Sequence, residues 1–203
     1  PTDEAVDFLN DLSKQGYEGI VVQLPVGKDL DTNTILNSVP ESQDIDLLSD
    51  IAKESYKSGK TERIPPVARA FNEIIRRYAI DISGKKLVVL GFGRLVGKPI
   101  SILLHKTSVP HEMLDKSSTE AGKLASLLSA DIVVSGIGVP HYIKPEMIKE
   151  GSILIDAGTS GEEGKLAGDI DPACGEKASL ITPVPGGVGP ITVASLFYNL
   201  YLK

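Results

Sequence analysis

The sequence predicts an α/β protein built around a parallel sheet that helices cover on both faces. Short, continuous runs of Val, Ile and Leu alternate with segments whose apolar residues recur at helical spacing. Strands that are apolar along their whole length are typical of parallel sheets, which helices bury on both faces. The 203 residues are enough for one domain or for one and a half, and for a sizeable core.

The alternation is most regular after residue 85. We expect strands over 86–91, 111–114, 131–138, 152–158 and 179–184, and helices over 96–106, 118–129 and 144–150. The helix 118–129 aligns Ala121, Leu124, Ala125 and Leu128, and the C-terminal helix aligns Val193, Leu196, Phe197, Leu200 and Tyr201. Segment 161–170 predicts a turn or a protruding arm.

The first part of the chain is less regular. We expect a helix over 4–13 with Ala5, Phe8, Leu9 and Leu12 on one face, a strand over 19–26, and a helix over 67–78 with Val67, Ala70, Phe71, Ile74, Ile75 and Tyr78 on one stripe. Segment 26–62 is polar, with a short helix at 47–57. We expect domains over 1–81 and 82–190, with the helix of 191–203 packing back on the first.

Composition and charge disfavour several classes of protein. The net charge of −6 gives no basic surface for nucleic acid or an anionic membrane. No apolar run approaches the roughly 18 residues that span a bilayer, and the N-terminus does not resemble a signal peptide. The single cysteine, Cys174, indicates a reducing compartment. We expect the cytoplasm; the mitochondrion stays open, because the chain begins at Pro1 without an initiator methionine.

The histidines His105, His111 and His141 show no metal-ligand spacing, so we predict no metal site. Cys174 has no histidine near it in the sequence and is interpreted as a bystander thiol.

Four predicted strands end in small residues, mostly glycine: LVVLGFG, IVVSGIG, ILIDAGT and ITPVPGG. Ligands of open α/β sheets bind at the carboxyl ends of the strands, beside the point where the strand order reverses. We therefore expect a bound molecule along this edge, with Ser135, Gly136 and Gly138 among its contacts.

The stretch GFGRLVGKP follows a strand and precedes a helix, which is the context of a dinucleotide-binding loop. Gly91 and Gly93 permit a tight turn and close approach to a pyrophosphate at the helix N-terminus. Gly97 comes one place later than in the usual fingerprint, so a plain strand–loop–helix turn stays an alternative. Arg94 and Lys98 are candidates for phosphate contacts or are solvated surface charges.

The stretch ITPVPGGVGPIT joins a strand to a helix through Gly186, Gly187 and Gly189. Glycine lets a flat ligand press against the backbone, and Pro190 suits the first turn of a helix. A tight turn is the alternative. If the backbone angles of Gly187 tolerate a side chain, we expect Gly187→Ala to weaken ligand binding and to leave the fold intact; an equal loss of thermal stability would instead indicate a structural glycine.

Taken together, GIVVQLP, QDID, VVLGFGRLVGKPI, IKEGSILIDAG and ITPVPGGVGPITVASL resemble the methylenetetrahydrofolate dehydrogenase/cyclohydrolase family, in order over almost the whole chain. The resemblance implies a Rossmann-type cofactor domain plus part of a smaller α/β catalytic domain, and a homodimer. It implies no nucleic-acid or membrane partner.

The resemblance also implies roles for individual residues. Gln23, Leu24 and Pro25 match the family's V-Q-L-P at the reacting centre, and Asp46 matches an aspartate that binds the pterin ring. Gly91, Phe92, Gly93 and Thr159 match cofactor contacts, and Pro185, Gly186 and Gly187 line the cleft between folate and nicotinamide, with Thr192 nearby. From the residues alone, Gln23 is equally a strand-end amide and Asp46 a turn or helix cap.

The departures from the family pattern are specific. The family's catalytic tyrosine and lysine, four residues apart, lie upstream of V-Q-L-P and are absent here; Tyr56 and Lys60 share the spacing by coincidence. The family lysine of K-D-V-D-G is Gln43, its glycine is Leu47, and a T-P pair is Val67 and Ala68.

The function we expect is oxidation of 5,10-methylenetetrahydrofolate to the methenyl form with a nicotinamide cofactor. We do not expect the cyclohydrolase step, which needs a general base. The alternatives are an inactive nucleotide-binding relative, a fragment of a bifunctional enzyme, and a dehydrogenase of another small substrate.

We expect the cofactor to be NAD, with NADP as the alternative. Asp115 follows the strand 111–114, where dinucleotide folds place the acid that binds the ribose hydroxyls. A carboxylate there would also repel a 2′-phosphate. Lys116 is adjacent and favours a phosphate, and a strand-end aspartate is also a common helix cap.

Overall fold

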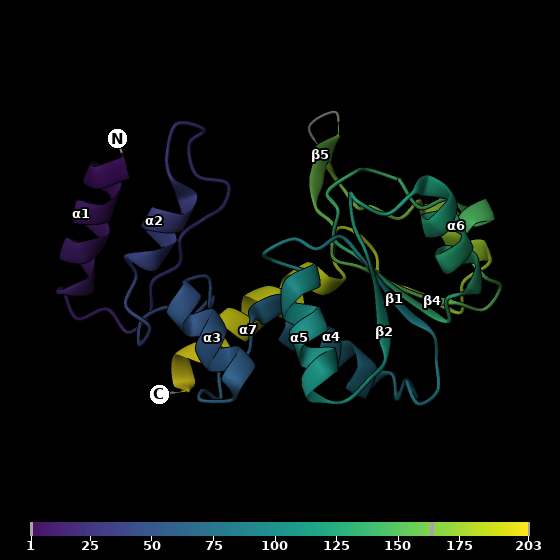
Figure 1. Ribbon diagram of the computed structural model, residues 1–203, viewed down its shortest axis with the longest axis horizontal. Helices are drawn as coiled ribbons and strands as arrows, with labels where there is room; N and C mark the ends of the chain where they lie inside the picture. The colour runs from purple at the N-terminus through teal and green to yellow at the C-terminus, as the bar shows by residue number, and fades with distance from the viewer. Residues whose placement is uncertain (1, 163–164, 203) are drawn as a thin grey trace. The chain divides into compact units, whose positions relative to one another are not determined.

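The structure is a computed structural model that describes residues 2–162 and 165–202 (Figure 1). Its α-helices are α1 Thr2–Ser13, α2 Thr32–Asn37, α3 Asp50–Ser58, α4 Pro66–Arg77, α5 Gly97–Lys106, α6 Glu120–Ser129 and α7 Val188–Tyr201. Its strands are β1 Leu87–Leu90, β2 His111–Leu114, β3 Ile132–Ser135, β4 Ile153–Asp156, β5 Ser160–Glu162, β6 Lys165–Ala167 and β7 Leu180–Ile181. Two short 3-10 helices, η1 Pro145–Met147 and η2 Pro172–Glu176, complete it.

By its internal contacts the chain divides into two compact units. Val67–Val193 form one unit, and the residues up to Pro66 form the other together with those from Ala194 onward. The expected boundaries near residues 81 and 190 stay a prediction. None of the helices in the described ranges is long and apolar enough to cross a membrane.

The unit of Val67–Val193 contains a five-stranded parallel sheet in the order β2-β1-β3-β4-β7. The predicted α/β fold with a parallel sheet is confirmed. The chain leaves β1 toward the edge strand β2 and later returns to the other side of β1 as β3. Because such crossovers are right-handed, α5 and α6 cover opposite faces of the sheet (Figure 1).

The core on one face of the sheet is built from alternate strand residues. Val88, Leu90, Val133 and Leu154 pack with Leu127 of α6 and with Ile143 and Ile148. The sequence predicted a different face for α6, because Leu124 and Leu128 are exposed while Ser126 and Leu127 are buried. Ser126 Oγ donates to Glu112 Oε1 of β2 at 2.7 Å, which turns the 126–127 side toward the sheet. A polar contact thus overrides the apolar stripe.

Two other predicted elements of this unit differ in form. The helix expected over 144–150 is only the 3-10 turn η1. The expected arm at 161–170 contains an antiparallel pair of β5 and β6 with Ser160 opposite Ala167; residues 163–164 lie outside the described residues.

The first unit has a small core of Leu9, Ile20, Ile35 and Val39. The strand expected over 19–26 is wrong, since its only pairing in the described residues is a parallel bridge between Ile20 and Asp44. Extended apolar backbone becomes a strand only where a neighbour pairs with it. The short helix α2 was not expected; Asp31 caps it by accepting from the backbone N–H groups of Asn33 and Thr34.

Three expected helix faces also change. Phe8 of α1 is exposed although Leu9 beside it is buried, and Tyr78 is exposed just past α4, whose Ala70, Phe71 and Ile74 are buried as predicted. In α7, Val193, Phe197 and Tyr201 are exposed, and Ser195 and Asn199 are buried instead. Asn199 Nδ2 donates to the carbonyl oxygens of Ile45 and Ile64, each at 2.8 Å, which accounts for its burial.

Candidate functional site

The carboxyl ends of the central strands lie in register along one edge of the sheet. Leu90 pairs with Leu114 of β2 and with Ser135 of β3, and Ser135 pairs with Asp156 of β4. The loops that the sequence singled out therefore begin side by side. The strand order reverses between β1 and β3, which is where α/β sheets bind their ligands.

Three glycines in these loops are required by backbone packing. Gly91 has a φ of +97°, and a Cβ there would lie 2.8 Å from the carbonyl oxygen of Gly136. A Cβ at Gly97 would overlap the carbonyl oxygen of Gly91, and a Cβ at Gly136 would overlap the side chain of Val96. The backbone of the loop after β1 thus lies directly against the loop after β3.

Gly93 is different, because nothing in the fold requires a glycine there. Its φ is not in the left-handed region, and a Cβ would meet only the carbonyl oxygen of Gly136, at 3.9 Å. An exposed glycine with room for a side chain at this edge is a cradle for a ligand that approaches the backbone.

The same loop carries positive charge. Lys98 lies in the first turn of α5, with its Nζ 5.3 Å from the centre of the exposed Phe92 ring, and Arg94 is half-buried in the loop. Val96 precedes the helix without a side-chain cap, so the N-terminus of α5 is open to an anion. These features suit a phosphate group.

Asp115 follows β2 at the same edge. Ser117 donates to its Oδ1 through both the backbone N–H, at 2.8 Å, and Oγ, at 2.6 Å, and these bonds lower the pKa of the Asp115 carboxyl. The backbone N–H of Ser118 and the charge of Lys123 also lower the pKa of this carboxyl. The cap of α6 is Thr119, so Asp115 is not the helix cap that the sequence left open.

In the turn between β7 and α7, the backbone itself requires glycine at Gly186 and Gly187. Gly186 has a φ of +103°, and a Cβ at Gly187 would overlap the carbonyl oxygen of Pro183, to which the Gly187 N–H donates at 2.9 Å. The site therefore does not tolerate a side chain, so the condition for an intact fold in Gly187→Ala is not met and the alternative of a structural glycine is favoured. Gly189 is unhindered, with nothing within 4 Å of an added Cβ.

The other residues predicted for the cofactor occupy varied surroundings. Thr159 is exposed beyond β4, and Gly138 is exposed with a φ of +70°. Thr192 donates to the carbonyl oxygen of Val188 inside α7. Ser135 is fully buried and donates to Asp169, so any effect of its side chain on a ligand passes through Asp169.

The residues predicted for folate lie in the first unit. Gln23 and Pro25 are exposed, Leu24 is half-buried, and Gln23 Nε2 donates to the carbonyl oxygen of Leu24 at 3.1 Å. Asp46 is half-buried, and burial, followed by repulsion from Asp44, raises the pKa of its carboxyl to about 6. One parallel bridge, between Ile20 and Asp44, links the segment that leads to Gln23 with the segment that leads to Asp46.

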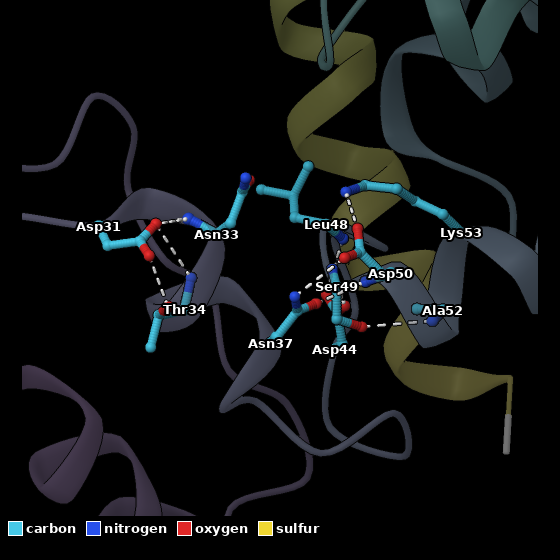
Figure 2. A network of polar contacts seen from close by, with 10 residues as sticks. All are labelled: Asp31, Asn33, Thr34, Asn37, Asp44, Leu48, Ser49, Asp50, Ala52 and Lys53. Atoms are coloured by element: carbon cyan, nitrogen blue, oxygen red, sulfur yellow. Dashed lines mark hydrogen bonds and ion pairs between the residues drawn. The ribbon is translucent and has the colours of Figure 1, made fainter. Parts of the chain in front are cut away.

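A polar network holds the segment that carries Asp46 (Figure 2). Asp44 accepts from the backbone N–H groups of Leu48 and Ser49, at 3.2 and 2.8 Å, and Ser49 caps α3. Asn37 exchanges hydrogen bonds with Asp50. Thus Asp44, rather than Asp46, forms the turn that the sequence left as an alternative for Asp46.

The departures from the family pattern have local explanations. Leu47, where the family has glycine, is buried with a φ of +57°, so the backbone keeps a conformation that glycine adopts most easily. Gln43, where the family has lysine, donates to the carbonyl oxygens of Ser13 and Tyr17. Gln43 also lines a groove of about 740 Å³ with Lys60 and Arg63, and none of the predicted folate residues lines it.

The chain resembles proteins of known function along nearly its whole length. A family model described as the tetrahydrofolate dehydrogenase/cyclohydrolase NAD(P)-binding domain matches residues 65–203. The bifunctional protein FolD of Clostridium tetani is 40% identical over 200 residues, which cover 98% of this chain and 71% of that protein. The chain belongs to this family.

Solved structures agree with this assignment. A 5,10-methylenetetrahydrofolate dehydrogenase from the silkworm Bombyx mori superposes with a TM-score of 0.91 at 30% identity. The match covers 98% of this chain and 72% of the silkworm chain. The FolD of Trypanosoma brucei, solved with NADP and an inhibitor, superposes with a TM-score of 0.90 at 30% identity. The match covers 99% of this chain and 71% of the T. brucei chain. The predicted family is confirmed, and with it an NAD(P)-binding domain.

Sequence reasoning missed two buried acids at this edge, Asp156 and Asp169. Asp156 ends the motif ILIDAG and Asp169 follows a glycine in the expected arm, but neither spacing pointed to a role. A signal was present, because polar residues so close to apolar strand ends must have hydrogen-bond partners. Among the described residues, no three His, Cys, Asp or Glu side chains gather where they could hold a metal ion.

We predict that Gly93→Ala will weaken cofactor binding without cost to the fold. The melting temperature should stay or rise slightly, because alanine restricts the unfolded chain. The dissociation constant for the cofactor should rise about tenfold, because the methyl group displaces a phosphate from close contact. Calorimetric titration and thermal unfolding measure the two effects.

Gly175→Ala is the matched control, since its Cβ would make ordinary contact with Ile181 at 3.6 Å, away from the loops of the carboxyl edge. Unchanged affinity in Gly93→Ala would show that this loop does not receive the ligand.

Proposed function

We propose that this chain oxidises 5,10-methylenetetrahydrofolate to 5,10-methenyltetrahydrofolate and passes the hydride to a nicotinamide cofactor. The observation that carries the proposal is the open glycine cradle at Gly93, with Arg94, Lys98 and the N-terminus of α5 around it. Membership of the family adds support, and so do the relatives whose names state this dehydrogenase activity.

The main requirement of this reaction is that the folate and nicotinamide rings are aligned. A hydride leaves the methylene carbon with its electron pair, the folate becomes a cation, and the nicotinamide ring accepts the hydride. The protein has to hold two flat rings in contact and to exclude water. We assign the phosphates to the loop of Gly91–Gly93 and to Arg94 and Gly97, and the nicotinamide side to Gly136, Gly138 and Thr159.

For folate we propose the segment Gln23–Pro25 and Asp46 of the first unit. Within the unit of Val67–Val193 we propose Pro185, Gly186, Gly187 and Thr192 as ligand contacts. Gln23 carries an amide that pairs with either a donor or an acceptor. Asp46 is an acceptor when ionised and suits the N–H groups of a pterin ring. A folate substrate fits the family; a homodimer and a cytoplasmic location stay predictions.

The comparisons do not support our doubt about the cyclohydrolase step, because the T. brucei relative is named as a methylenetetrahydrofolate dehydrogenase-cyclohydrolase and the C. tetani relative as a bifunctional protein. Cyclohydrolase activity is therefore tested by a separate measurement.

We predict that the purified chain will reduce the cofactor only when methylenetetrahydrofolate is present. A spectrophotometric assay of cofactor reduction tests this, and hydrolysis of the methenyl product is followed in the same preparation. Binding of cofactor without reduction would contradict the proposal and would favour an inactive nucleotide-binding relative.

We predict that folate binding will weaken as the pH falls through about 6. Burial and Asp44 raise the pKa of the Asp46 carboxyl to about 6, so acid removes the charge that accepts from the pterin ring. The same shift means that the folded state takes up this proton before the unfolded state does, so its contribution to the free energy of unfolding grows as the pH falls from above 6 toward 4.

Calorimetry with a folate that lacks the labile methylene bridge measures the binding. Asp46→Asn should bind weakly at every pH, while Asp7→Asn, at an exposed position of α1, should follow the wild type. A wild-type affinity that is constant between pH 7.5 and pH 5 would contradict a role for the Asp46 carboxylate.

We predict that NAD will bind more tightly than NADP, and that Asp115→Asn will narrow the difference. The ionised Asp115 carboxylate at the end of β2 can accept from a ribose hydroxyl, a bond to a charged acceptor worth roughly 1.5–3 kcal/mol, and its charge repels a 2′-phosphate. Titration of both cofactors into wild type and variant gives the ratio. Equal wild-type affinities, or a ratio that the substitution leaves unchanged, would refute the assignment.

A further inference from the structure

Asp169 holds the loop that follows β3. Its side chain is completely buried and accepts three hydrogen bonds. Oδ2 accepts from Ser135 Oγ at 2.8 Å and from the Ile137 N–H at 2.7 Å, and Oδ1 accepts from the Val139 N–H at 3.0 Å. One carboxylate therefore binds the end of β3 and two amides of the following loop, which lie 30 to 34 residues before Asp169 in the sequence.

Asp156 holds Asp169 in turn. It ends β4, is 2% exposed, and accepts from the backbone N–H groups of Gly158, Asp169 and Ile170 at 3.0, 3.2 and 2.9 Å. Burial is the main cause that raises the pKa of the Asp156 carboxyl to about 6, and the charge of Asp169 adds to it. In the described part of the chain neither acid forms an ion pair with Lys, Arg or His.

Glycines in the surrounding backbone make room for these two carboxylates. A Cβ at Gly158 would overlap the Asp169 carboxylate, and a Cβ at Gly168 would overlap the Asp156 carboxylate. The backbone of this segment is also held: the His141 N–H donates to the carbonyl oxygen of Gly168, and the Ile143 N–H donates to the backbone carbonyl oxygen of Asp169. The acid is therefore held rigidly before any ligand arrives.

The loop that Asp169 fixes is the one that meets the dinucleotide loop. Its first residue, Gly136, places a carbonyl oxygen against Gly91, and its third, Gly138, has a φ of +70°. If the amides of Ile137 and Val139 were released, the contact between the two loops would lose its support at the point where the strand order reverses.

We propose that Asp169 is a positioning residue for the dinucleotide, which fixes residues 136–139 in the shape that receives the cofactor. This inference rests on the proposed function for its ligand. Asp169 itself touches no substrate in this account and acts through the loop. All three of its partners are donors, a set that an acceptor-only carboxylate satisfies and that an amide cannot, because the amide turns an NH₂ group toward one of them.

The test combines Asp169→Asn with cofactor titration and with hydrogen exchange of the individual amides by NMR. We expect the variant to stay folded, the Ile137 and Val139 amides to exchange at least about tenfold faster, and the dissociation constant for the preferred cofactor to rise about tenfold. Asp171→Asn is the control, because it removes a charge two residues away whose partners are Lys144 and the Ala173 N–H.

The milder variant Ser135→Ala removes one donor to Asp169 and keeps the two amides. It decides the question if Asp169→Asn does not fold: faster exchange at Ile137 with weaker cofactor binding supports the proposal, and wild-type values for both overturn it. A folded Asp169→Asn that binds cofactor like the wild type also overturns it. A wild type that binds neither NAD nor NADP would refute the proposed function instead, and the exchange rates would still show whether Asp169 sets the loop.

Discussion

The loop after β1 packs its backbone directly on the loop after β3, and the dinucleotide site depends on that contact. A side chain at Gly91 or Gly136 would force the two loops apart, and one at Gly97 would clash with the carbonyl oxygen of Gly91 inside the first loop. Because these three positions stay bare, α5 begins close to the end of β1 and the strand ends stay in register. Packing does not require a glycine at Gly93, and this is the position that we propose faces the ligand.

Buried carboxylates support this arrangement by binding backbone amides. Asp169 and Asp156 do so at the sheet edge, and Asp44 does so beside Asp46 in the first unit. A buried charge is costly unless hydrogen bonds compensate it, and backbone N–H groups do so without a cation. At the sheet edge these acids hold amides that are distant in sequence, whereas Asp44 holds its own turn.

Much of this could be predicted from the sequence, because parallel strands and glycine loops leave local signals. β1 was found as a run of apolar residues that ends in glycine, and the family motifs lie where those signals end. What local signals could not show is which neighbour a segment meets. The stretch 19–26 is extended and apolar but pairs only at Ile20. Asp169 looked like part of an arm, since its partners lie 30 to 34 residues earlier in the chain.

The central claim is that the carboxyl edge of this sheet binds a nicotinamide dinucleotide, and amide chemical shifts measured during titration with NAD and NADP test it most directly. The account predicts saturable shifts at residues 91–98, 136–139 and 157–159 with at least one of the two cofactors. The amides of residues 149–153, at the amino ends of the strands, should not move. Shifts confined to that opposite edge, or none at saturating cofactor, would contradict the account.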